Sequence, residues 1–541
     1  MRPPVLPVRR MCLATALALV LPGLGLAAGP PKNMASRTSR MPDPSLDTLA
    51  WVGTGAVTAA DLVRRIEWMP WSEKKRAAGM DSAKVRALQS LAGEELLAQE
   101  AEREGIGDSG SVGRMRASLR KALVRDALFR DVVAGTPAAS AAEVDRIVRH
   151  RALRATPEAR RALRRAVADS LRGLGVLRRA SAFMAGVLGG QRAVVDSATF
   201  MLLADSLRSL MARSPPPAVH AGSHPLLPEY VEALLAAPGP DLERPLVLLP
   251  GDPLRLGEAL EAMRFYAFSL RSLEPRPFAA ELSARLRTVV EGELMAREGL
   301  RRGLDRRPDV RRDLEMWTTA WRAQLLLQRV SSGPEAGDDV AFRRLALADP
   351  EAAVRACEVD VAEILSGSES QAVRLRSLLD AGASFDSLAR LYTVREEWRE
   401  QGGHSGYFKV AHRPDLGYAA LLTPAGPLCG PLRLPEGYTV FRVLGKRLDP
   451  DSLAARGLLE AARAEATAEL RGERAARYVA ALAEQARVKF DYAALRGVDV
   501  LQADMLTKRF LGFGGGMLAF PSLPRLWDWV RIWYGAHPKL P

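Results

Sequence analysis

Two stretches of the chain, 198 residues apart, match each other without a gap: "EELLAQEAEREGIGDSGSV" lies over "GELMAREGLRRGLDRRPDV". One accidental match between helices rich in Leu, Ala and Glu means little. A single offset that holds for about eighty residues, with matching glycines, instead predicts a duplicated helical unit. The pairs that carry the match include Gly53 and Gly251, Leu62 and Leu260, Glu95 and Glu293, Glu100 and Glu298, Gly105 and Gly303, and Leu128 and Leu326.

A second similarity, at a different offset, joins residues 182–196 to residues 477–491 and marks the end of the unit. The first copy then covers about 48–210 and the second about 246–500, so the second copy contains an insertion. The predicted segments are 1–27 (signal peptide), 28–45 (flexible leader), 46–210 (first helical unit), 211–243 (linker), 244–345 (second helical unit), 355–448 (inserted domain), 449–500 (C-terminal helix completing the second unit) and 501–541 (aromatic-rich tail).

The N-terminus has the pattern of a signal peptide. Arg9 and Arg10 precede a short apolar stretch that is interrupted by Pro22, and small residues near Ala27 suit cleavage. The stretch is too short for a good membrane span. We therefore expect an exported protein of the periplasm or cell envelope. Its net charge falls from +14 to +11 on cleavage, and Cys357 and Cys429 remain, with their pairing left open.

The inserted domain differs from its helical flanks. Val359, Val361 and Ile364 alternate along a predicted strand, and Ser384 is placed to cap a short helix. The stretch "GGHSGYF" at 402–408 predicts a tight turn into extended chain, and "GYTVFRVLGKR" predicts a strand. The order β-α-α-loop-β-β makes this a small α+β domain. The fold class expected for the whole chain is therefore mostly α with a duplicated helical unit and one embedded α+β domain.

The inserted domain contains five motifs in a fixed order: "EIL" at 363–365, "AGASFDSLARLYT" at 381–393, "GGHSGYF" at 402–408, "PAGPLCGPL" at 424–432 and "GYTVFRV" at 437–443. In order and spacing they resemble the motifs of parvulin-type (PpiC-like) peptidyl-prolyl cis-trans isomerases. The helical flanks are similar to those of exported foldases of the SurA and PrsA type. The resemblance implies a parvulin-like fold, chaperone-like helical units, and action on unfolded or proline-containing exported polypeptides, without a cofactor or metal.

The resemblance also implies which positions form the active centre. The family's first-strand His falls on Glu363, its Cys or Asp on Arg395, and its second His on Thr439, so all three catalytic positions are substituted. The family's loop Met falls near Arg413. The positions implied to bind substrate are Phe408, Arg413, Leu421 and Tyr438.

Two functions stay open on these grounds. The first is an exported peptidyl-prolyl isomerase and chaperone that assists the folding of secreted or outer-membrane polypeptides. The second is a catalytically degenerate chaperone or docking protein that binds unfolded clients. The difference matters because a His pair adjusts its protons near neutral pH, which Glu363 and Thr439 cannot do in the same way.

Loop histidines His404 and His412 have no third ligand at a recognisable metal spacing, so no metal site is predicted. Nine arginines crowd residues 151–179 against Glu158 and Asp169. They suit acidic client segments, lipid headgroups or simply a solvated helix face. Nucleic acid is not expected as a partner of an exported protein.

The tail holds seven aromatic residues between 510 and 534, together with two prolines and several charges. The charges and prolines exclude a simple membrane span. Two alternatives remain: residues 510–534 contact a membrane surface peripherally, or the segment docks on the protein through a face containing Leu526, Val530 and Trp533.

Overall fold

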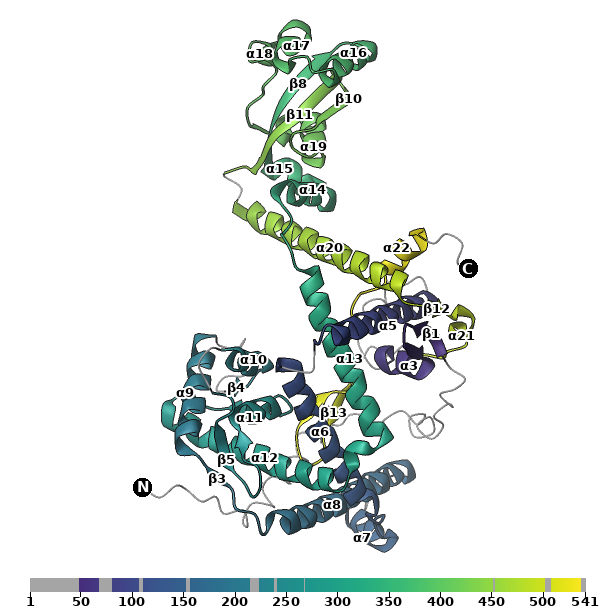
Figure 1. Ribbon diagram of the computed structural model, residues 1–541, viewed down its shortest axis with the longest axis vertical. Coiled ribbons are helices and arrows are strands. Elements are labelled where there is room, and N and C mark those ends of the chain that lie inside the picture. Colours follow the sequence, from purple (N-terminus) through teal and green to yellow (C-terminus); the bar gives the residue numbers. More distant parts are fainter. Residues whose placement is uncertain are drawn as a thin grey trace. The chain divides into compact units, whose positions relative to one another are not determined.

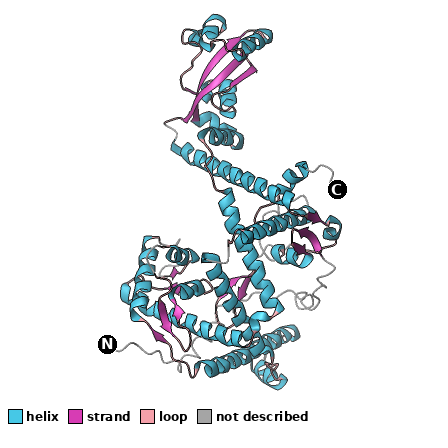
Figure 2. Cartoon of the chain, in the orientation of Figure 1, coloured by secondary structure: helices cyan, strands magenta, loops and turns pink. Residues whose placement is uncertain are grey.

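The computed structural model describes residues 48–67, 80–106, 110–151, 156–214, 223–237, 241–266, 268–450, 453–501 and 507–536. The predicted signal peptide (1–27) and leader (28–45) lie outside these residues. The described chain is mostly helical with several small sheets (Figures 1 and 2), as the sequence predicted. It divides into unit 1 (Met1–Leu326 with Ala481–Trp527) and unit 2 (Leu327–Ala480 with Asp528–Pro541).

Unit 1 is built mainly from long helices. Thr58 caps the short first helix, α3 (Ala59–Ile66), with its hydroxyl accepting a hydrogen bond from Asp61 N. Helices α13 (Pro308–Ser331) and α20 (Leu453–Gln485) have residues in both units. The other helices of unit 1 are α3 (Ala59–Ile66), α5 (Met80–Arg103), α6 (Gly110–Ala134), α7 (Ala141–Arg151), α8 (Pro157–Leu188), α9 (Ser197–Arg213), α10 (Pro228–Ala236), α11 (Leu256–Met263), α12 (Pro275–Arg301), the 3-10 turn η3 (Leu304–Arg306) and α21 (Tyr492–Arg496).

Two three-stranded sheets in unit 1, with orders β12-β1-β2 and β3-β5-β6, are antiparallel throughout. In each sheet, an aspartate directly follows one edge strand, Asp196 after β3 and Asp491 after β12. Asp196 N donates to Leu246 O at 3.0 Å, and Asp491 N donates to Leu49 O at 2.8 Å. The strands of unit 1 are β1 (Thr48–Val52), β2 (Gly55–Thr58), β3 (Val194–Val195), β4 (His224–Pro225), β5 (Pro245–Leu248), β6 (Leu254–Arg255), β7 (Ser269–Leu270), β12 (Val488–Phe490), β13 (Lys508–Phe510) and β14 (Gly516–Leu518).

Helices α5 and α12 end in the same way. Each is followed, two residues after its last residue, by a glycine in the left-handed region: Gly105 has φ 73° and Gly303 has φ 70°. A side chain is strained in this conformation, which explains why glycine stands at both positions. The chain then begins α6 and α13, whose start residues, Gly110 and Pro308, are also 198 apart.

Glu291 of α12 is a carboxyl group buried in unit 1. Burial raises its pKa to about 7. The unfolded chain loses this proton near its ordinary pKa of 4.5, so the folded state binds more protons between these values. Stability therefore falls as pH rises from about 4.5 to 7. We expect Glu291→Gln to abolish this fall and to stabilise the protein at pH 8 by up to about 3 kcal/mol.

This expectation is measured by thermal or urea unfolding of both proteins at pH 5 and pH 8. Glu298→Gln supplies the control, because hydrogen bonds from Arg301 lower the pKa of Glu298 to about 2. The contribution of Glu298 is lost only in acid, so its variant should not gain stability at pH 8. An unchanged pH dependence in Glu291→Gln would contradict the buried state of this carboxyl.

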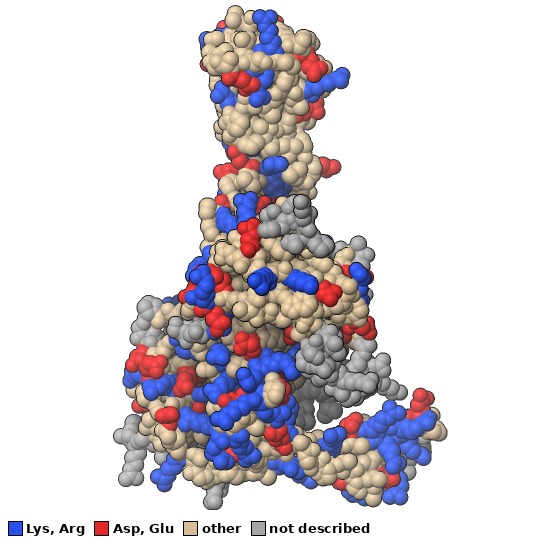
Figure 3. Space-filling model, turned by 45° about the vertical axis from the view of Figure 1, so that its right-hand side comes forward, with Lys and Arg blue, Asp and Glu red and all other residues tan. Residues whose placement is uncertain are grey.

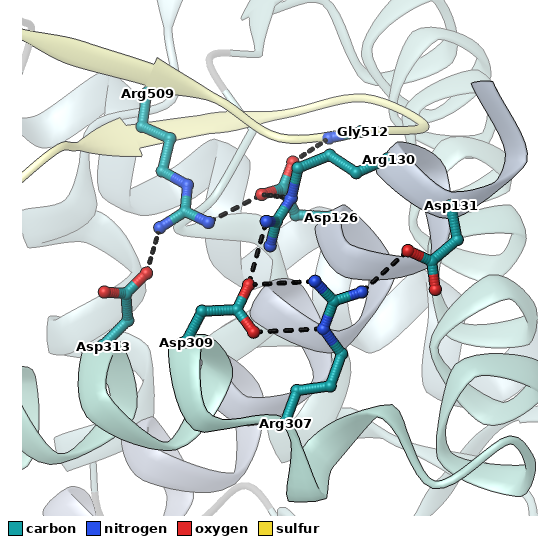
Figure 4. A network of polar contacts seen from close by, with 8 residues as sticks. All are labelled: Asp126, Arg130, Asp131, Arg307, Asp309, Asp313, Arg509 and Gly512. Carbon is teal, nitrogen blue, oxygen red and sulfur yellow. Dashed lines mark hydrogen bonds and ion pairs between the residues drawn. The ribbon is translucent and has the colours of Figure 1, made fainter. Parts of the chain in front are cut away.

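The tail packs on unit 1 through the hairpin β13–β14. Figure 4 shows Arg509 of this hairpin between Asp126 of α6 and Asp313 of α13, at 2.7 Å and 2.5 Å. Asp126 also accepts a hydrogen bond from Gly512 N at 3.0 Å. Around them, Arg307 pairs with Asp309 at the start of α13. The ion pairs Arg307–Asp131 and Arg130–Asp309 connect this start to α6.

Apolar residues of the tail are buried along with this network. Leu511 is 4%, Phe513 7% and Leu526 4% exposed, and Phe513 makes an edge-on contact with Phe129 at 5.3 Å. Val530 and Trp533 of α22 (Trp529–Ala536) are also buried. The expectation that these residues dock on the protein therefore has structural support, although Leu526 precedes the helix instead of sharing its face.

Unit 2 contains the small α+β domain. Its four-stranded antiparallel sheet has the order β10-β11-β8-β9. The strand predicted from the alternation of Val359, Val361 and Ile364 is β8. Ser384 caps α17, as predicted, by accepting a hydrogen bond from Ser387 N. The elements of unit 2 are α14 (Asp338–Ala348), α15 (Pro350–Ala356), β8 (Cys357–Ser366), α16 (Glu369–Asp380), α17 (Phe385–Tyr392), α18 (Glu396–Arg399), β9 (Phe408–Lys409), η4 (Val410–His412), α19 (Pro414–Leu422), β10 (Leu428–Leu434), β11 (Gly437–Leu448) and α22.

The two faces of this sheet carry different cores. Helices α16 and α17 cover one face, where Ala362 and Ile364 of β8 meet Leu375 and Phe385. The other face packs against α14, α15, η4 and α19. Over the residues that the structure describes, no helix is both long and apolar enough to span a membrane.

Candidate functional site

Six of the seven positions predicted for the active centre lie on the second face of the sheet or beside it; the exception is Tyr438. Glu363 pairs across the strands with Phe441, and Leu365 pairs with Thr439. Cross-strand partners share a face, and residues two apart on one strand do so too. Glu363 and Thr439 therefore point to the same side, where Leu421 is fully buried and Phe408 packs against the same core.

The glycine-rich turn (402–408) and the last strand, β11, lie along the two opposite edges of β8, so both border the same site. Glu363 N donates to Gly403 O at 2.9 Å, and Ser405 N donates to Val361 O at 2.9 Å. At Gly403, with φ 88°, a Cβ atom would come within 2.5 Å of Glu363 O. Glycine is therefore required for the turn to approach the strand this closely.

Glu363 and Arg395 form a buried ion pair at the centre of this face. Arg395 Nε lies 2.5 Å from Glu363 Oε2, and Arg395 Nη2 donates to Glu363 Oε1 at 3.3 Å. Glu363 is 1% and Arg395 8% exposed. Their charges compensate each other, so neither substituted position carries a free charge.

Trp398 of α18, which was not among the predicted site residues, contacts Arg395, Arg413 and Phe408. The guanidinium groups of Arg395 and Arg413 lie over its ring at 5.0 Å and 5.1 Å from the centroid, and the Phe408 ring lies 5.8 Å away. Such cation–π contacts stabilise arginines beside an aromatic surface. Trp398 is 7% exposed, so little of this aromatic surface is open to a ligand. Its being the single tryptophan within 355–448 is the sequence signal that could have identified it.

Two exposed carboxylates complete the arrangement. Glu397 is ion-paired with Arg413, and Glu436 lies 3.9 Å from both Arg395 and Arg413. The cation predicted at the family's Met position is thus neutralised at the rim instead of entering an apolar pocket. The charged part of the site consists of Glu363, Arg395 and Arg413 around Trp398, with acidic groups on its outer side.

Tyr438 and Thr439, the two predicted residues at the start of β11, lie on opposite faces of the sheet. Thr439 is fully buried, and its Oγ1 has no hydrogen-bond partner among the described residues. Tyr438 pairs with Ser366, one position further along, so its side chain belongs to the opposite face of the sheet. The structure therefore does not bring Tyr438 together with Glu363 and Thr439.

Two other kinds of reactive side chain occur in the small α+β domain, the cysteines and the loop histidines. Burial raises the pKa of the Cys357 thiol to about 12, and within the described chain Cys357 and Cys429 are both free thiols. The buried thiol of Cys357 is therefore a weak nucleophile. His404 lies 3.4 Å from Asp386, and no group of three or more metal-ligating side chains occurs among the described residues.

The strand order and the turn define a small antiparallel α+β domain of the kind that the motifs predicted. No family model matches the chain. Foldase protein PrsA 2 of Bacillus anthracis is 33% identical over 91 residues, which are 17% of this chain and 32% of that protein. PrsA 2 of Bacillus cereus is 32% identical over 91 residues, with the same coverage. The chain thus spans about a third of the length of the curated relatives it matches. The predicted resemblance to foldases is confirmed for this segment.

Solved structures give similarities of the same kind. A PpiC-type peptidyl-prolyl cis-trans isomerase domain is 22% identical, with 18% of this chain and 98% of that chain covered and a TM-score of 0.17. PrsA from Bacillus anthracis is 22% identical, with 32% and 76% covered and a TM-score of 0.19.

Proposed function

We propose that this chain is an exported foldase, in which residues 355–448 isomerise X-Pro bonds of unfolded polypeptides and the helical units hold those polypeptides as a chaperone. The observation that carries this proposal is the convergence of the glycine-rich turn and the last strand on β8. This geometry collects Glu363, Arg395, Thr439, Phe408, Arg413 and Leu421 at one site.

The reaction needs no covalent step. An X-Pro bond rotates slowly because its partial double bond must be lost on the way. A site that binds the proline ring and surrounds the twisted amide with polar groups lowers this barrier. Here Phe408 supplies apolar surface beside Trp398, and Arg413 and the Glu363–Arg395 pair supply polar groups.

A binding module without isomerase activity is the second candidate, and one observation favours it. The two guanidinium groups cover the aromatic ring of Trp398, and the Glu363–Arg395 pair fills the centre with compensated charge. A proline ring would have to displace Arg413 from Trp398 and Glu397 before it could bind. Under this alternative the small α+β domain binds clients or partners without isomerising them, and the helical units hold the unfolded polypeptides.

We expect the full chain to accelerate the slow, proline-limited refolding of a test protein. We also expect the triple variant E363H/R395D/T439H, which restores the family's residue types, to be faster by about tenfold, or 1.4 kcal/mol of barrier. Refolding is followed by fluorescence with and without each protein. Arg390→Gln, at an exposed arginine of α17, is the control and should match the wild type.

The outcomes separate the two candidates. Acceleration by the wild type supports the isomerase. Acceleration by the triple variant alone supports the binding module. If neither protein accelerates refolding but both suppress client aggregation, the chain is a chaperone without a usable isomerase centre.

We further propose that unit 1 contains two copies of one ancestral unit whose end strands are exchanged. Several observations support this. The glycines at 105 and 303 have nearly equal φ values, and α6 and α13 start 198 residues apart. The strand β3, late in the first copy, pairs with β5 of the second, while β12, late in the second, pairs with β1 of the first. The aspartates that follow β3 and β12 each cap a helix, through Thr199 N and Ala494 N.

The proposed location is the periplasm or cell envelope, and the proposed clients are unfolded or proline-containing exported polypeptides. The signal-peptide pattern at residues 1–27 supports export. For residues 510–534, the burial of Leu511, Phe513 and Trp533 supports docking over peripheral membrane contact. Phe510, which is 81% exposed, is the residue of this segment that a membrane contact would use.

A further inference from the structure

Helix α8 carries seven arginines along one side. At 3.6 residues per turn, their positions fall within an arc of about 140°, and the row from the first to the last is about 28 Å long. All seven side chains are exposed. This surface, called the arginine face below, consists of Arg160, Arg161, Arg164, Arg165, Arg172, Arg178 and Arg179.

The charge of the helical hairpin α7–α8 is strongly unbalanced. Residues 141–151 and 156–188 hold ten arginines against four carboxylates, a net charge of +6. The space-filling view shows Lys and Arg side chains gathered on one arm of unit 1, at the lower right (Figure 3). The ion pair between Arg164 and Asp145 joins the two helices of the hairpin at 2.6 Å.

The hairpin is a braced structure and not a loose basic segment. Val144 and Val148 of α7 and Val167 of α8 form a small core, against which Leu163 and Leu171 pack. At its start, Thr156 caps α8 by accepting a hydrogen bond from Ala159 N at 3.3 Å. The arginine face is therefore presented on a rigid support whose apolar side is already used.

We propose that the arginine face of α8 binds the surface of an anionic lipid bilayer. Between its arginines the arc holds only Ala168, Leu171 and Gly175, so it contains no aromatic anchor. Protein-binding surfaces usually concentrate their affinity in aromatic or arginine residues that are set in desolvated pockets. A straight, exposed row of like charges instead matches a plane of headgroups, whereas one extended acidic peptide covers a narrower strip. Within the row, Arg164 also pairs with Asp145 and Arg179 donates to Gly135 O, and the other five arginines supply most of the charge for the headgroups.

The test is co-sedimentation of the full chain with vesicles of phosphatidylglycerol and phosphatidylcholine at increasing salt. We expect binding to anionic vesicles, none to pure phosphatidylcholine, and loss of binding as salt rises. The variant R161Q/R165Q/R172Q should bind about 100-fold more weakly, because each arginine near the surface contributes roughly fivefold. R161K/R165K/R172K keeps the charge and should retain most of the affinity.

The matched control is R276Q/R374Q/R390Q, which removes three exposed arginines elsewhere and changes the net charge equally. It should bind vesicles nearly as well as the wild type. Equal losses in both glutamine variants would overturn the proposal, since net charge alone would then explain binding. Binding of a poly-glutamate peptide to the arginine face without binding of anionic vesicles would overturn it in favour of an acidic polypeptide partner.

Discussion

Glu363→Gln is expected to lower the free energy of unfolding of the small α+β domain by about 3 kcal/mol, although it changes one atom of a side chain. The substitution leaves the guanidinium of Arg395 buried without its counter-ion. Arginine cannot lose its proton to relieve this cost. Breaking one side of a buried ion pair typically costs about 3–5 kcal/mol, and the carboxylates of Glu397 and Glu436, each 3.9 Å away, place the value at the lower end.

The effect is measured in the full chain by hydrogen exchange of the amides of β8 and β11, which are paired along their length. Glu436→Gln is the matched control. It removes a half-exposed carboxylate of the same site and should cost less than about 0.5 kcal/mol.

A double variant tests the physical reason for this prediction. E363M/R395M removes both charges and fills the space with apolar side chains, so its stability should lie near that of the wild type. If the double variant is as unstable as Glu363→Gln, the loss comes from packing and the argument from uncompensated charge fails.

Local signals in the sequence predicted the elements of the small domain well. Ser384 and the turn glycines act on residues close to them in the chain, and the structure has the predicted cap and positive φ values at Gly402, Gly403 and Gly406. The face of Tyr438 was also predictable. Side chains alternate along a strand, so Thr439 and Tyr438 cannot both point into one site.

The composition of the site depends on contacts that a sequence does not contain. Trp398 has no family motif to mark it, and its role follows from two guanidinium groups and one aromatic ring that converge on it. Likewise, a cation near the position of the family's loop Met would bear a desolvation cost if it entered an apolar pocket. The structure places Arg413 against Glu397 and Trp398, which removes most of that cost.

The tail (501–541) also depends on a contact that cannot be predicted from the sequence, here between residues much further apart in the chain. Its aromatic residues suggest either docking or membrane contact, and a contact that favours docking is made by Asp126, 383 positions before Arg509. No periodicity or composition links two residues so far apart. The contact can be tested in its own right.

Asp126→Asn is expected to release the hairpin β13–β14 from unit 1. Asp126 is 6% exposed and accepts hydrogen bonds from Arg509 Nη2 and Gly512 N. The amide of asparagine retains one acceptor for Gly512 but presents N–H groups to Arg509. Since Asp313 still pairs with Arg509, we expect a cost of about 2 kcal/mol, below that of a fully broken buried pair.

Limited proteolysis measures this release directly, by trypsin cleavage after Arg509 and chymotrypsin cleavage after Phe510. A cost of about 2 kcal/mol raises the open population, and hence the cleavage rate, roughly 30-fold when opening and closing are fast. Asp131→Asn is the matched control on the same helix. Asp131 is half exposed and pairs with Arg307 at 2.7 Å, so its loss should change the rate less than about twofold. Equal cleavage of both variants would mean that the apolar contacts of Leu511 and Phe513 hold the tail without help from the buried carboxylate.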